Sequence, residues 1–259
     1  DKLVFHGSFE TKREQSNVLL FLPKTKGLFG TKKFKNFIKN EFNLLEYDDV
    51  QTEDSGCFDK SCVTSLEHKA SAINIAMEKW KGIKFHIICH STGCGLGTFL
   101  AKKNKNSCRS LILISPWNRA DYDFIALQKK RVENAKKLEN SLFIKSEYHL
   151  LYSSEYIKKF ETQFHQYILN NKDKNVDYIQ IEKRLQSILD CDIGKELRKL
   201  MLPKLLINSL DDKLMKVHHG QELKKLSTNT KLISLDNGGH MLTETRADDL
   251  NIYIKSFQL

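Results

Sequence analysis

Long apolar stretches are absent from this chain of 259 residues. A helix that spans a membrane needs about 20 consecutive apolar residues, and no run of even 18 occurs, so we expect no membrane span. Internal repeats, low-complexity linkers and nucleic-acid-binding motifs are also missing, so neither a repeat array nor a nucleic-acid partner is indicated. No secretory signal pattern occurs, although the chain starts at Asp1 rather than Met, which leaves an earlier leader open.

The six cysteines form no Cys-x-x-Cys pair and fit no zinc-binding spacing. We therefore expect no metal site, and nothing implies an organic cofactor. Unpaired thiols are typical of a reducing compartment, so the sequence predicts a cytoplasmic protein. A disulfide between Cys57 and Cys62 is the one exception that the spacing leaves open.

Acidic residues are fewer than basic ones: 32 Asp and Glu against 42 Lys and Arg give a net charge of +10. The excess gathers in residues 60–110, where nine basic residues meet two acidic ones. This segment is expected to supply two helices that cover a sheet, and the simplest interpretation is a solvated, lysine-rich surface. A basic outer face could also attract an acidic partner.

The stretch 84–100 combines a strand-type apolar run, a few small residues and the start of a helical pattern. Ser91 lies at the junction, with Gly93 and Gly95 just after it. A strand that turns sharply into a helix exposes the side chain at the turn, and it needs neighbours with little side chain because strand and helix nearly touch. The helix N-terminus adds free N–H groups and a partial positive charge, which suit an oxyanion. This pattern predicts a nucleophile elbow, although Cys89 stands where Gly-x-Ser-x-Gly has its first glycine.

Strand-type runs alternate with helical periodicity along most of the chain, which predicts an α/β fold with a doubly wound, mostly parallel sheet. The expected strands cover residues 3–9, 18–22, 43–47, 85–89, 110–115, 203–208 and 231–235. The expected helices outside the elbow cover residues 33–42, 63–81, 218–226 and 245–257.

Only helical periodicity occurs between about residues 119 and 190, at 124–138, 155–169 and 176–189. An insertion between two strands is expected to form a helical cap over the C-terminal edge of the sheet. We therefore expect a core formed by residues 1–117 and 193–259, with a cap at 118–192. The aromatic residues of the cap could line an acyl pocket or simply pack its helices together.

Acyl transfer needs a nucleophile, a base within hydrogen-bond reach and an acid that orients the base. Ser91, Asp212 and His240 each follow a predicted strand, and they occur in the order Ser, Asp, His. Asp211 is the rival of Asp212, whereas the His-His pair at 218–219 falls at a predicted helix start. The carboxyl ends of parallel strands form the ligand-binding edge of such a sheet, so we expect the three side chains to converge there.

Two loops could supply the second N–H of an oxyanion hole beside the N–H of Thr92. One is His6-Gly7; the other follows the run 18–22, which is more apolar, as a central parallel strand should be. We prefer the second loop, so Thr25 or Lys24 is expected to supply the donor.

These motifs resemble the α/β-hydrolase superfamily from about Val18 to Phe257. The family's Gly-Gly-His is matched by residues 238–240, and its Gly-x-x-Asp turn loosely by Ser209-Leu210-Asp211-Asp212. The stretches 115–121 and 148–156 and the elbow His90-Ser91-Thr92-Gly93 are similar to the 3-oxoadipate enol-lactonase and aminoacrylate hydrolase-like carboxylesterase group. The resemblance implies the α/β-hydrolase fold and serine hydrolysis, but it does not fix the substrate.

We therefore expect a serine hydrolase that cleaves a carboxylic ester or thioester of a small to medium acyl group through an acyl-enzyme, without metal or cofactor. One alternative is a hydrolase of acyl groups carried on an acidic carrier protein, which the basic segment would attract. Another is a catalytically impaired member of the fold that binds a ligand or protein, because Cys89 and Pro23-Lys24 depart from the family pattern.

Overall fold

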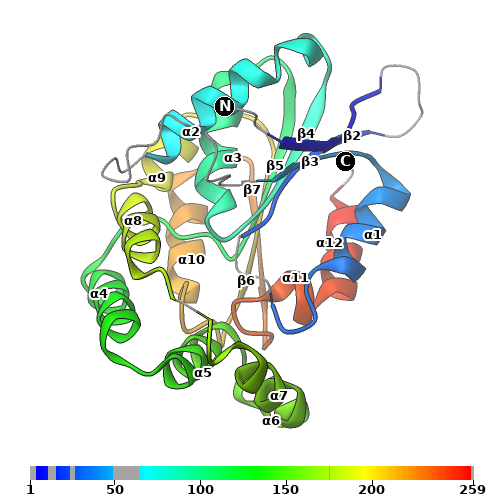
Figure 1. Cartoon of the computed structure of the whole chain (residues 1–259). Coiled ribbons are helices and arrows are strands. Elements are labelled where there is room, and N and C mark those ends of the chain that lie inside the picture. The colour runs from blue at the N-terminus through cyan, green and yellow to red at the C-terminus, as the bar shows by residue number, and fades with distance from the viewer. Residues whose placement is uncertain (1–3, 11–15, 24–26, 49–64, 175, 258–259) are drawn as a thin grey trace.

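The computed structural model describes residues 4–10, 16–23, 27–48, 65–174 and 176–257. Seven strands form one sheet in the order β1-β3-β2-β4-β5-β6-β7 (Figure 1). The strands are β1 (Val4–Gly7), β2 (Asn17–Phe21), β3 (Asn43–Asp48), β4 (Phe85–His90), β5 (Cys108–Ile114), β6 (Lys204–Ser209) and β7 (Thr230–Leu235). Strand β1 pairs antiparallel with β3, and every other pairing is parallel. The predicted α/β-hydrolase fold with a mostly parallel sheet is confirmed.

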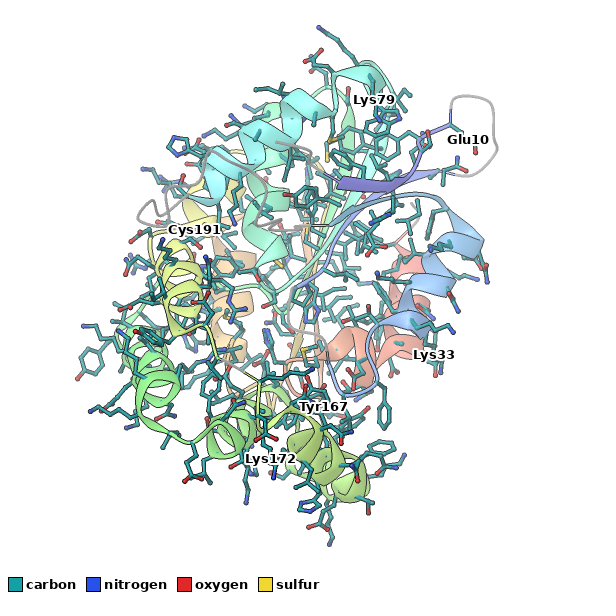
Figure 2. The ribbon with its side chains drawn as sticks, in the orientation of Figure 1. Glu10, Lys33, Lys79, Tyr167, Lys172 and Cys191 are labelled. Carbon is teal, nitrogen blue, oxygen red and sulfur yellow. The ribbon has the colours of Figure 1, made fainter. Side chains whose placement is uncertain are left out.

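Helices cover both faces of the sheet because alternate residues of its apolar strands point to opposite sides. On one face, α1 (Lys32–Glu41) and α12 (Ala247–Ser256) pack on Val18, Leu20 and Ile112. On the other face, α2 (Leu66–Ala76) and α3 (Gly93–Lys103) pack on Leu19 and Ile87 together with α9 (Ile193–Leu197) and α10 (Val217–Leu226) (Figure 1). Polar ends such as that of Lys33 on α1 point away from the core (Figure 2).

The insertion between β5 and β6 is helical, as expected, and lies beyond the C-terminal edge of the sheet (Figure 1). Its helices are α4 (Tyr122–Lys137), α5 (Asn140–Leu151), α6 (Ser154–Lys159), α7 (Glu161–Asn171) and α8 (Tyr178–Leu189). The prediction of one helix over 155–169 is wrong, because the chain breaks at Phe160, which ends α6 and begins α7.

Other helix ends also differ from the sequence prediction. The helix predicted at 63–81 ends at Ala76 and is followed by a 3-10 turn, η1 (Glu78–Trp80). The last helix begins only at Ala247, after the short α11 (Leu242–Thr245). The short α9 had no separate prediction, because five residues are too few to show a period.

Within the described ranges, no helix is both long and apolar enough to cross a membrane. Cys89, Cys94, Cys108 and Cys191 are buried and free. Cys57 and Cys62, whose pairing was left open, lie outside the described residues.

Candidate active site

Ser91 lies on a strained turn between β4 and α3. Its φ angle of 54° falls in the left-handed region, which residues with a side chain rarely adopt without a structural reason. Two backbone hydrogen bonds hold the turn: the N–H of Ser91 donates to the carbonyl of Ile114 at 2.9 Å, and its carbonyl accepts from Cys94 N–H at 2.8 Å. A Cβ at Gly93 would lie 2.7 Å from the carbonyl oxygen of Phe21, so only glycine lets α3 start this close to β2.

Cys89 replaces a glycine of the usual motif, and the structure shows how the chain accommodates it. A Cβ added at Gly97 would lie 2.1 Å from the Cys89 sulfur. Helix α3 therefore approaches β4 over the thiol because its own residue 97 carries no side chain. Burial raises the pKa of the Cys89 thiol well above its ordinary value, so this group stays an inert packing element.

The structure brings Ser91, His240 and Asp212 together in one hydrogen-bonded row. The Nε2 atom of His240 lies 2.8 Å from the Ser91 hydroxyl, and its Nδ1 atom lies 2.9 Å from Asp212 Oδ2. The other carboxylate oxygen of Asp212 accepts the N–H groups of Leu214 and Met215, each at 2.8 Å. The three residues follow β4, β6 and β7, which end at the same edge of the sheet with β5 between β4 and β6, and all three residues are buried.

Asp211 does not reach the imidazole. One of its oxygens accepts the Ser209 hydroxyl and the N–H of Gly239, the latter at 2.8 Å. This carboxylate therefore stabilises the Gly238-Gly239 turn, which immediately precedes His240. Of the two rival aspartates, the geometry pairs Asp212 with the histidine.

His90 supports the backbone of His240, a contact that sequence reasoning missed. Its Nε2 atom lies 2.8 Å from the carbonyl of His240, and its Nδ1 atom lies 3.0 Å from the Thr243 hydroxyl. A carbonyl can only accept, so Nε2 carries the proton and Thr243 donates to Nδ1. Burial, and secondarily the nearby His240, lowers the pKa of His90 to about 3, so this ring stays neutral at ordinary pH. No spacing rule distinguishes such a support from any other histidine.

The cap is hydrogen-bonded to the loop that carries His240. The N–H groups of His240 and Met241 donate to the carbonyl of Leu151, at 2.9 and 3.2 Å. A Cβ at Gly239, whose φ is 66°, would lie 2.8 Å from the same carbonyl. The close approach of α5 to this loop therefore depends on glycine at position 239.

The two segments considered as donors to the oxyanion hole belong to strands in different parts of the sheet. Strand β2 pairs directly with β4, the strand that ends at the elbow. Strand β1, which holds His6 and Gly7, is separated from β4 by β3 and β2. Lys24 and Thr25 lie outside the described residues, but Pro23, just before them, lines the same pocket as Ser91 and Thr92. Thr92 caps α3, where the first N–H groups have no acceptor within the helix.

The pocket over Ser91 and His240 is small and partly cationic. It encloses about 30 Å³, room for about two water molecules. Arg131 lines it but is already engaged, because its Nε donates to Glu147 at 2.9 Å and its Nη1 to Gln128 at 2.9 Å. Arg184 lines it too, and its guanidinium has no hydrogen-bond partner among the described residues. Burial and the nearby Arg131 lower the pKa of Arg184.

The aromatic side chains of the cap mostly contact one another. Tyr148 packs on Phe164 with ring centroids 4.8 Å apart, and Tyr152 stacks on Tyr156 at 5.3 Å. Tyr167, labelled in Figure 2, joins the group through Tyr148 at 5.3 Å. None of the rings lines the pocket at Ser91, which is walled instead by aliphatic side chains such as those of Leu151, Leu185, Ile188 and Leu214.

A serine on a strand-to-helix turn, beside a histidine that a carboxylate orients, is typical of hydrolases with this sheet. The chain belongs to the α/β-hydrolase fold family, whose model matches residues 64–247, more than half of its length. It is therefore assigned to a family of hydrolases.

Individual relatives are distant. RutD of Acinetobacter baylyi, provisionally named a carbamate hydrolase, is 23% identical over 262 residues, which cover 96% of both chains. RutD of Agrobacterium fabrum, with the same provisional name, is 25% identical over 181 residues, 68% of this chain and 67% of that protein. The enol-lactonase from Burkholderia xenovorans LB400 superimposes with a TM-score of 0.79 at 16% identity, covering 98% of this chain and 95% of that one. An α/β hydrolase from a Medee basin deep-sea metagenome gives a TM-score of 0.80 at 16% identity, with coverage of 98% and 93%.

Proposed function

We propose that the protein is a serine hydrolase that cleaves the carboxylic ester or thioester of a small acyl group. The observation that carries this proposal is the row Ser91–His240–Asp212, with hydrogen bonds of 2.8 and 2.9 Å. His240 takes the hydroxyl proton while Ser91 Oγ attacks the acyl carbon, and it then delivers that proton to the leaving group. Water, activated by the same imidazole, hydrolyses the acyl-enzyme.

Asp212 fixes the imidazole and offsets the charge that develops on it. Its Oδ2 faces Nδ1, which places the proton of neutral His240 on Nδ1 and leaves Nε2 free to act as the base. The oxyanion would be held by the N–H of Thr92 and by a second N–H from Lys24 or Thr25. One such donor contributes about 3–4 kcal/mol to lowering the barrier in comparable enzymes.

The pocket favours a short acyl group with negative charge. The cavity of about 30 Å³ suits a short acyl group, and Arg184, which lines the same pocket as Ser91 and donates no hydrogen bond to a described residue, offers a cation for a negative charge. The same features support a second candidate reaction, the cleavage of a small carbamate. Its acyl carbon is attacked in the same way, and the curated relatives carry the name carbamate hydrolase.

The two alternatives from the sequence are less well supported. Lys102, on the basic helix α3, is already paired with Glu196 at 2.9 Å and Glu67 at 3.5 Å, which weakens the attraction for an acidic carrier protein. The alternative of impaired catalysis was based partly on Cys89, but the sulfur of this residue fits against Gly97 without displacing Ser91.

We also retain the proposal of a reducing, cytoplasmic setting, to which the four free cysteines are suited.

The test combines a covalent probe with a panel of short substrates. A fluorophosphonate is expected to label wild-type protein at Ser91, and Ser91→Ala is expected to lose both labelling and p-nitrophenyl acetate hydrolysis. Ser110→Ala is the matched control, because Ser110 is also a buried serine but lies within β5, where its hydroxyl contacts His86 rather than His240. Absence of labelling in the folded wild-type protein would favour a binding role. Hydrolysis of carrier-bound but not free thioesters, suppressed by salt, would favour the carrier substrate.

A further inference from the structure

A second group of side chains, whose ligand atoms could bind a metal ion, lies between the cap and the core. Asp121 precedes cap helix α4, whereas His218 and His219 lie in the first turn of core helix α10. Their ligand atoms all lie within 4.8 Å of one another. Among the described residues, this is the one cluster of three or more Asp, Glu, His or Cys side chains that could hold a metal ion.

We propose that Asp121, His218 and His219 bind a divalent first-row transition metal such as Zn²⁺, which links the cap to the core. The donors are one carboxylate oxygen and two imidazole nitrogens, a set that suits such ions. The cavity at this cluster shares only Leu214 with the pocket at Ser91, and the proposal does not depend on the hydrolytic reaction.

The distances need only a small adjustment to hold an ion. The Oδ2 atom of Asp121 lies 2.8 Å from His218 Nε2 and 4.0 Å from His219 Nε2. Ligands about 2.1 Å from a tetrahedral ion lie roughly 3.4 Å from one another, so the observed separations fall on both sides of that value. The rings of His218 and His219 have centroids 4.2 Å apart, so these neighbouring residues present their rings side by side.

The ligand atoms of Asp121 and His218 are hydrogen-bonded to each other, a bond that an ion between them would replace. Asp121 Oδ1 is used by the N–H of Phe124 at 2.8 Å, which caps α4 and frees Oδ2. His219 is buried, yet its Nδ1 has no hydrogen-bond partner. Its Nε2 is 4.0 Å from the carboxylate, too far for a hydrogen bond. An ion at Nε2 would give this buried ring a partner that the described protein groups do not supply.

The space and charge around the cluster suit an ion with three protein ligands and a fourth coordination position open to the cavity. A cavity of about 340 Å³ adjoins the cluster and is lined by all three residues. Lys216, which also lines it, is paired with Asp123 at 2.8 Å, so its charge is offset; Lys213 is the other cation at the cavity. Leu214 lines both this cavity and the pocket at Ser91. An ion bound here would therefore restrain one side of the pocket at Ser91.

The test uses the full chain, stripped with a chelator and exchanged into clean buffer. Equilibrium dialysis against Zn²⁺ is expected to give one ion per chain, and Zn²⁺ is expected to raise the Tm. Asp121→Asn, His218→Ala and His219→Ala should each raise the Kd for Zn²⁺ at least tenfold. Asparagine keeps the oxygen that caps α4, so its effect reports on the ligand rather than on the helix.

His165→Ala, on the exposed surface of α7, is the matched histidine control and should leave the Kd unchanged. His218 is partly exposed, so its variant decides the test even if His219→Ala fails to fold. Wild-type protein that binds no stoichiometric Zn²⁺, or His218→Ala protein that binds it as tightly as wild type, would overturn the proposal.

Discussion

Replacing Gly97 by alanine is expected to destabilise the protein through one clash. The added Cβ would lie 2.1 Å from the Cys89 sulfur and 3.1 Å from Ile87 Cγ2. Both neighbours are wholly buried on β4, so neither can move into solvent. Overpacking of this kind costs about 1–3 kcal/mol. Alanine gains about 1 kcal/mol in helix propensity over glycine, which offsets part of that cost.

Removing the sulfur should reverse the effect. In Cys89→Ala/Gly97→Ala the new methyl group would occupy the space that the thiol leaves, and it would lie 3.6 Å from the Cβ of residue 89, an ordinary contact. Cys89→Ala alone should cost about 1 kcal/mol for the buried atom it loses. The double variant should be at least as stable as Cys89→Ala alone, which makes the coupling favourable by about 1–3 kcal/mol.

Urea unfolding of the four proteins measures this coupling as a double-mutant cycle. Cys94→Ala is the matched control, because this buried thiol lies on α3 itself and is not among the atoms closest to a Cβ at residue 97. Its effect should add to that of Gly97→Ala. Additive effects within about 0.5 kcal/mol for the Cys89 pair would refute the reasoning that glycine at 97 compensates for cysteine at 89.

Three further outcomes are expected. Asp212→Asn should lower kcat for p-nitrophenyl acetate by about 10⁴-fold, as in comparable triads, whereas Asp211→Asn, which keeps its oxygen acceptor, should lower it far less; equal losses would contradict the pairing. Arg184→Gln should raise KM at least tenfold for a short ester that carries a carboxylate, but not for a neutral one, and Lys183→Gln on the same helix should do neither. Burial raises the pKa of Glu244 above its ordinary 4.5, so the folded state holds the proton more tightly than the unfolded state. Wild-type stability relative to Glu244→Gln should then fall as pH rises from 4.5 through that raised pKa, and a pH-independent difference in urea unfolding would contradict this.

The sequence predicted the structure best in segments where one hydrophobic pattern or one motif dominates. The buried runs of β2, β4, β5 and β6 are continuous and apolar, so their strands were predicted to within one or two residues. Ser91, Asp212 and His240 were placed together because each follows a predicted strand, and parallel strands end at one edge. The geometry now brings these side chains to hydrogen-bond distance, and their catalytic role is the subject of the tests above.

The sequence was least informative where contacts depend on side-chain direction across the fold. The break at Phe160 leaves the helical periodicity of 155–169 intact, since both halves are helical. The roles of His90 and Thr243 depend on a carbonyl 150 residues from His90 along the chain. The partnership of Cys89 with Gly97 also has no sequence signal of its own, because it arises from the distance between a strand and the helix above it.

The hydrogen bonds from residues 240 and 241 to the carbonyl of Leu151 mean that the cap is not an interchangeable module. A chimaera with a relative's cap in place of residues 118–192 would keep these two hydrogen bonds only if the new backbone follows the path of Leu151. Such a graft should succeed more often when the donor's histidine loop is transplanted together with the donor's cap. Any evolutionary change of cap in this lineage would face the same requirement, so the two segments should be inherited together.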